Sequence, residues 1–90
     1  MKPITISESL KSQIYEIHTF GKREDMNSLY ARIATERVRI SKFMDMFLEE
    51  FDEKLEAGDA KLQSLYDKKF EEYQLATQLL KTMEYYMKGQ

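Results

Sequence analysis

The chain has 90 residues, a formal net charge of -2, one histidine and no cysteine, which excludes disulfides and thiolate metal sites. The stretch MKPITISESL lacks the apolar core of a signal peptide, and no window approaches the roughly 18 apolar residues of a membrane span. We therefore expect one cytoplasmic domain over residues 1–90, with no membrane contact. A domain this short buries only about 60% of its unfolded surface, so its stability should be modest.

The first segment is predicted to be a helix over about 5–19. Thr5 and Glu8 have the spacing of a capping box, in which the hydroxyl and the carboxylate satisfy free amides of the first turn. Gly21 follows the helix and could adopt the positive φ that helix ends often require. The apolar residues that share one helical face are Ile6, Leu10, Ile14 and Ile17.

Two longer helices are predicted over about 25–56 and 60–87, because apolar residues there recur at steps of three and four. One charged residue interrupts each stripe, Arg37 in the first and Lys69 in the second. Each helix would extend for roughly 40–45 Å at 1.5 Å per residue. The two stripes comprise Met26, Tyr30, Ile33, Ile40, Met44, Phe47 and Phe51, and then Leu62, Tyr66, Tyr73, Ala76, Leu80, Met83 and Met87.

The stretch between the long helices, at 57–59, is predicted to reverse the chain. Gly58 suits the left-handed position after a helix, and Asp59 suits the N-cap of the next one. A connection this short makes the two helices antiparallel, which gives an all-α fold with a long helical hairpin. The alternative is one uninterrupted rod, since a glycine inside a helix costs only about 1 kcal/mol.

The half of the hairpin next to this turn, residues 43–70, is called the distal half. The first helix would span about 22 Å at 1.5 Å per residue, so it should pack on the other half and leave the distal half uncovered. The apolar residues of the distal half spread too widely around the two helices for those helices alone to bury them. Exposed apolar patches of this kind usually indicate association with another chain. The alternative is a longer, tilted or shifted first helix that seals the whole groove. The predicted partner interface comprises Phe43, Met44, Phe47, Leu48, Phe51, Leu55, Leu62, Leu65, Tyr66 and Phe70.

The charges lie in blocks along the chain. Residues 22–44 hold six basic and three acidic side chains, whereas residues 45–60 hold seven acidic side chains and one lysine. In an antiparallel homodimer the acidic block of one copy would lie near the basic block of the other. The charged side chains that could form such contacts are Arg32, Arg39, Lys42, Glu49 and Glu53.

No pattern of catalytic or metal-binding residues is present in the sequence. His18 lies at the flank of an apolar stripe and has no nucleophile at a recognisable spacing, which favours a structural role. The carboxylates of residues 49–53 scatter around the polar side of a helix, which is typical of a solvated face. Metalloprotease, phosphate-binding and dinucleotide-binding motifs are missing. The sequence therefore predicts no enzyme activity, no cofactor and no metal site.

The composition and the predicted fold favour a protein–protein interaction module that binds another protein, a second copy of itself, or both. An adaptor, a chaperone of the secretion type and a small inhibitor all fit this description. The alternative from another class is a small nucleic-acid-binding regulator that uses the basic 22–42 segment, although a slightly acidic domain disfavours it. A structural subunit whose hairpins stack into an assembly is a third possibility.

Overall fold

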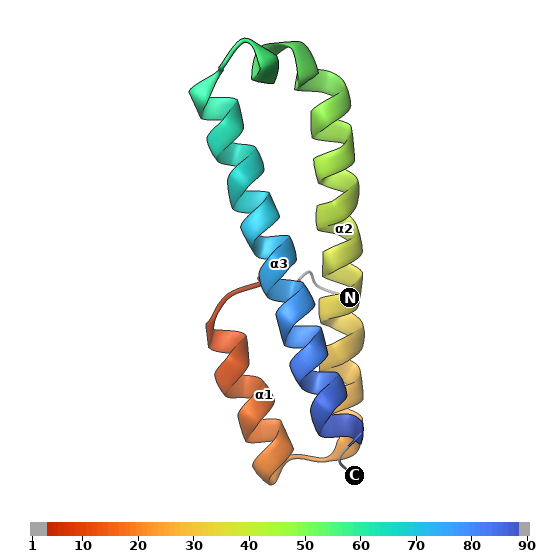
Figure 1. Ribbon diagram of the computed structural model, residues 1–90. Coiled ribbons are helices and arrows are strands. Elements are labelled where there is room, and N and C mark those ends of the chain that lie inside the picture. The colour runs from red at the N-terminus through yellow and green to blue at the C-terminus, as the bar shows by residue number, and fades with distance from the viewer. Residues whose placement is uncertain (1–3, 89–90) are drawn as a thin grey trace.

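The computed structural model describes residues 4–88, which fold into three helices and the segments that join them. Helix α1 spans Ser9–Phe20, α2 spans Arg23–Glu56 and α3 spans Ala60–Lys88. Helices α2 and α3 form a long antiparallel hairpin, and the shorter α1 packs against both of them at the end away from the turn (Figure 1). This arrangement confirms the predicted all-α fold.

The hydrophobic core lies in the half of the hairpin that α1 covers. Ile33 of α2 and Met83 of α3 are completely buried there, and Ile14 of α1 is almost so. Because α1 reaches only this half, the apolar stripes of α2 and α3 are fully enclosed only here. The core comprises Ile6, Leu10, Ile14, Met26, Leu29, Ile33, Ile40, Ala76, Leu79, Leu80 and Met83.

The start of α1 differs from the prediction. The helix begins at Ser9 rather than near residue 5, and the capping box of Thr5 and Glu8 is not formed. Glu8 instead makes an ion pair of 2.7 Å with Lys11. The non-helical residues before Ser9 bury Ile6 against the core. Burial of this side chain therefore takes the place of another helical turn, which local spacing alone could not indicate.

The connection between α1 and α2 also differs from the prediction. Gly21 has φ of -91°, so it does not adopt the left-handed conformation. A glycine is needed at this position for lack of space, since an added Cβ would lie 2.9 Å from the carbonyl oxygen of Ile17. The carboxylate of Asp25 accepts a hydrogen bond of 3.1 Å from the backbone N–H of Lys22, which caps the first turn of α2.

The turn between α2 and α3 forms as predicted. Gly58 has φ of 87°, and its N–H donates to the carbonyl of Leu55 while the N–H of Asp59 donates to that of Lys54. These two bonds define a Schellman motif at the end of α2. The carboxylate of Asp59 then accepts a 3.1 Å bond from the N–H of Leu62 and caps α3.

Helix α2 is bent near its end. Phe51 has φ of -116° and ψ of 15°, outside the helical range, although hydrogen bonding continues on both sides. In Figure 1 the last part of α2 turns away from the line of the helix and runs toward the start of α3. The straight part of α2 therefore ends at Glu50, and the bend helps the short turn to bridge the two helices.

Candidate protein-binding surface

Two charged residues interrupt the predicted apolar stripes, and both lie against aromatic rings of the facing helix. The guanidinium carbon of Arg37 is 5.9 Å from the ring centroid of Tyr73, and Nη1 makes a long hydrogen bond of 3.4 Å to the hydroxyl of Thr77. The ammonium of Lys69 is 5.4 Å from the ring centroid of Phe43. Each cation thus joins α2 to α3 without a buried unpaired charge.

A row of aromatic rings holds the distal half together. Phe47 is only 6% exposed and lies at its centre. Its ring centroid is 5.8 Å from that of Phe43, 4.9 Å from that of Phe51 and 6.1 Å from that of Tyr66. These are ordinary separations for packed aromatic side chains. Phe47 therefore stabilises the hairpin itself and has little surface to offer a partner.

The remaining members of the predicted interface are open to solvent to different degrees. Phe43, Leu48, Leu65 and Phe70 expose 39–52% of their surface, and we call these four residues the distal surface. Five others are half-buried: Met44, Phe51, Leu55, Leu62 and Tyr66. Within residues 4–88 no helix besides α2 and α3 covers this half, as the sequence predicted.

The distal surface does not form a single face. Phe43 and Leu48 are five positions apart on α2, which places them about 140° apart around the helix axis. They lie on opposite flanks of the buried Phe47. Met46, which is 68% exposed, adds to the Phe43 side of the helix. Met46 was not among the predicted interface residues because it lies outside the main stripe, although its position three residues after Phe43 is a usable signal.

The charged side chains proposed as partner contacts occupy varied settings. Nη1 of Arg39 is 3.5 Å from the carboxylate of Glu36, in an ion pair on the surface of α2. Arg32 is half-buried, and its Nε has no hydrogen-bond partner within residues 4–88. The other three, Lys42, Glu49 and Glu53, are exposed.

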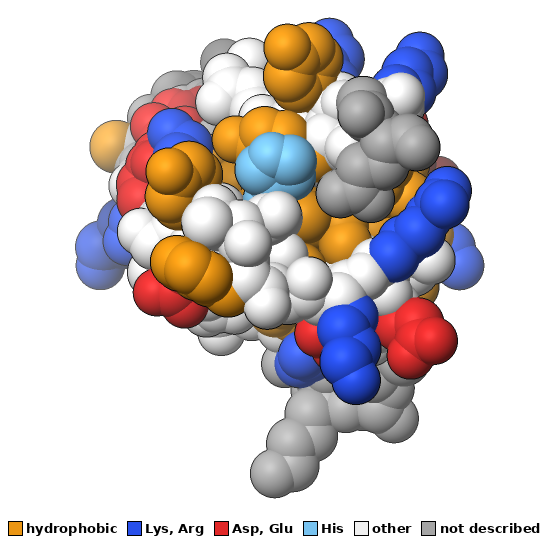
Figure 2. Space-filling view, turned by 90° about the horizontal axis from the view of Figure 1, so that it is seen from below, with side chains coloured by type: hydrophobic (Ala, Val, Ile, Leu, Met, Phe, Trp, Pro, Cys, Tyr) orange, Lys and Arg blue, Asp and Glu red, His pale blue; other side chains and the backbone are white. Residues whose placement is uncertain are grey.

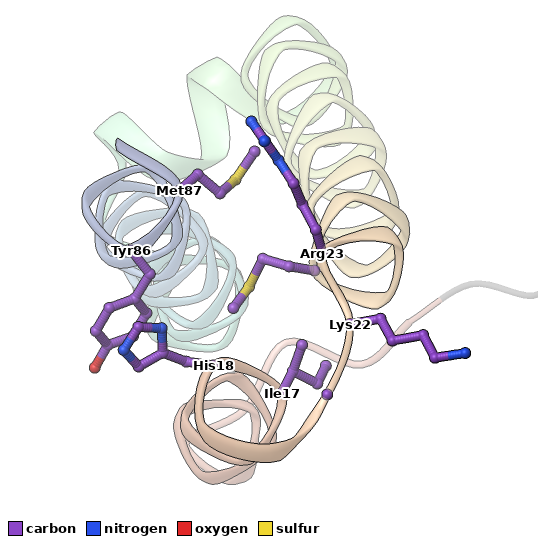
Figure 3. A pocket seen from close by; sticks show the side chains of 8 residues that line it. Ile17, His18, Lys22, Arg23, Tyr86 and Met87 are labelled. Carbon is purple, nitrogen blue, oxygen red and sulfur yellow. The ribbon is translucent and has the colours of Figure 1, made fainter. Parts of the chain in front are cut away.

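A small hollow lies at the opposite end of the molecule, where α1 ends and α2 begins. The ring of His18 stacks on that of Tyr86 with centroids 4.0 Å apart and an angle of 12° between the rings. Figure 2 shows this histidine in the middle of the end face, beside hydrophobic side chains. In Figure 3 Lys22 points away from the hollow, while Ile17 lines its floor. The stack explains the place of His18 at the flank of an apolar stripe.

Residues 4–88 contain no group of three potential metal ligands, and none of their helices is long and apolar enough to cross a membrane. Comparisons of the chain with models of known protein families, with curated proteins and with solved structures give no match.

Proposed function

We propose that this protein is a protein-binding module without enzymatic activity, and that it associates through the distal surface as a homodimer. The observation that carries the proposal is the exposure of Phe43, Leu48, Leu65 and Phe70. They lie on the half of the hairpin that α1 does not cover. Association with another chain that removes such exposed apolar side chains from water lowers the free energy.

The expected partners follow from the shape and chemistry of this surface. A symmetric pair is the commonest way in which such a surface is closed, so a second copy is the first partner to test. A dimeric helical module of this kind would serve as an adaptor, a chaperone of the secretion type or a small inhibitor. The proposed setting is the cytoplasm, because a chain without cysteine needs no oxidising compartment to fold.

The proposal is tested by sedimentation equilibrium across micromolar to submillimolar concentrations. We expect the wild-type chain to show a monomer–dimer equilibrium, and the double variant Phe43→Asp/Leu48→Asp, which places a charge on each flank of α2, to remain monomeric. Both side chains are substantially exposed in the monomer, so the charges should not disturb folding, and circular dichroism checks this. A wild-type chain that is monomeric at every concentration would overturn the homodimer.

The matched control is Phe20→Asp, which places the same charge on an exposed apolar residue at the other end of the molecule. Phe20 is more exposed than any member of the distal surface. This variant should dimerise like the wild type. If it also became monomeric, the distal surface would not be the site of association.

A further inference from the structure

The exposed flank of α2 carries a short second stripe. Arg39, Phe43, Met46 and Glu50 follow one another at steps of four, three and four, and all four are exposed. This spacing places them in one row along the helix, separate from the main stripe that contains Ile40. The row ends with the last residue of the straight part of α2, just before the bend at residue 51.

The order of residues in this row is self-complementary. A cation stands at one end, two large apolar side chains in the middle and an anion at the other end. When two such rows pack antiparallel about a two-fold axis between residues 44 and 45, Phe43 of each copy faces Met46 of the other. The same register places Arg39 of each copy opposite Glu50 of the other.

The steps of the row also match the layers of an antiparallel coiled coil. Residues 43 and 50 take one of the two core positions of a heptad, and residues 39 and 46 take the other. In an antiparallel coiled coil each layer pairs a residue at one core position with a residue at the other core position. The facing pairs Phe43–Met46 and Arg39–Glu50 both meet this condition. A parallel pair would instead place Arg39 against Arg39 and Glu50 against Glu50, so like charges disfavour it.

We propose that the second copy docks on this row of α2, antiparallel and in the register that pairs Phe43 with Met46 and Arg39 with Glu50. This inference rests on the proposed function and specifies the geometry of the homodimer. Arg39 keeps donors free for Glu50 of the other copy, because only its Nη1 pairs with Glu36. The apolar centre supplies the affinity, and the charges select the orientation.

Charge reversal tests the register. Arg39→Glu alone and Glu50→Arg alone each create two repulsive pairs per homodimer, and each should raise the dimer Kd about tenfold or more at low salt. An equimolar mixture of the two variants should form heterodimers, because both facing pairs then become attractive. The double variant Arg39→Glu/Glu50→Arg should dimerise like the wild type.

The matched control mixes Arg39→Glu with Glu49→Arg. Glu49 undergoes the same change of charge but lies about 100° around the helix from Glu50. This mixture should not favour heterodimers. Heterodimer formation equal to that of the Glu50→Arg mixture would show that total charge, rather than the proposed register, controls pairing, and would overturn the inference.

Disulfide cross-linking tests the orientation, since the chain has no cysteine of its own. In an equimolar mixture of Arg39→Cys and Glu50→Cys we expect the mixed disulfide to predominate under mild oxidation. Positions 39 and 50 are about 16 Å apart along α2, so a parallel pair would instead form the disulfide between two copies of the same variant. That product, or the absence of any cross-link from a chain that dimerises, would overturn the inference.

The outcomes separate the register from the proposed function. If Phe43→Asp/Leu48→Asp dissociates the dimer, but charge reversal has no effect and the disulfides form at other positions, the proposed function stands and the register is overturned. A chain that is monomeric at all concentrations would overturn both.

Discussion

The hydroxyl of Tyr30 on α2 donates a hydrogen bond of 2.9 Å to a carboxylate oxygen of Glu84 on α3, 54 positions later in the chain. The bond joins the two helices of the hairpin next to the buried core. The pKa of Tyr30 lies above its usual 10.0. The largest cause is this hydrogen bond, which deprotonation of the hydroxyl would break. Partial burial and the negative charge of Glu84 raise the pKa further.

Because the pKa of Tyr30 is higher in the folded chain, its contribution to stability is fully present below pH 10 and is lost as pH rises through the raised value. We expect Tyr30→Phe to lower the free energy of unfolding by about 0.5–1.5 kcal/mol at pH 8, with the low end favoured by the exposure of the bond. The difference from the wild type should shrink at pH 11. Urea unfolding at both pH values measures it.

The control for this prediction is Tyr15→Phe, since Tyr15 is 60% exposed on α1. Its removal should change stability little at either pH. A Tyr30→Phe variant as stable as Tyr15→Phe at pH 8 would show that the bond to Glu84 contributes nothing.

The turn residue Gly58 should tolerate substitution according to backbone conformation alone. An added Cβ would meet nothing within 4 Å, so the cost of Gly58→Ala comes from its φ of 87° and should be about 1 kcal/mol. Gly58→Asn should cost less, since asparagine enters the left-handed region more readily. Equal losses of stability in urea for the two variants would contradict this explanation.

Gly21 should respond to substitution for a different reason. The Cβ of Gly21→Ala would lie 2.9 Å from the carbonyl oxygen of Ile17, so the end of α1 must shift. We expect hydrogen exchange to rise in α1 while the α2–α3 hairpin keeps its protection, because α1 makes far fewer contacts than the hairpin helices make with each other. Unchanged exchange in α1 would count against the close approach.

One buried methionine, Met83, and one exposed methionine, Met46, give a paired test of where the core lies. Met83 is completely buried, so Met83→Ala should lower the free energy of unfolding by about 2–5 kcal/mol. Met46→Ala removes the same atoms from a side chain that is 68% exposed, and monomer stability should change by less than about 0.5 kcal/mol. Thermal unfolding at low concentration, where the monomer prevails, measures both.

The nucleic-acid hypothesis makes its own measurable demand. Arg37 lies against Tyr73 and Thr77, and Arg39 pairs with Glu36, so part of the basic 22–42 segment is already engaged. We expect no saturable binding of labelled duplex or single-stranded oligonucleotides at micromolar protein in about 0.15 M salt. Tight binding that weakens steeply between about 50 and 200 mM salt would revive the hypothesis.

Local patterns in the sequence were sufficient to predict the helical hairpin. The turn at Gly58 and Asp59 depends on conformational preferences and caps that involve only neighbouring residues, so spacing alone indicated it. The inequality of helix lengths was also visible, and with it the uncovered distal half. The prediction of a capping box at Thr5 was wrong because local spacing cannot weigh a cap against burial of Ile6 by distant helices.

By itself the sequence therefore determined the three helices, their antiparallel hairpin and the excess of apolar surface near the turn. Only the tertiary structure decided how that surface is divided. It buries Phe47 between the helices, leaves Phe43 and Leu48 exposed, and bends α2 at Phe51 so that the straight helix ends at Glu50. The physical reason is that exposure depends on which side chains of α3 stand opposite, and the register between two helices is set by their packing.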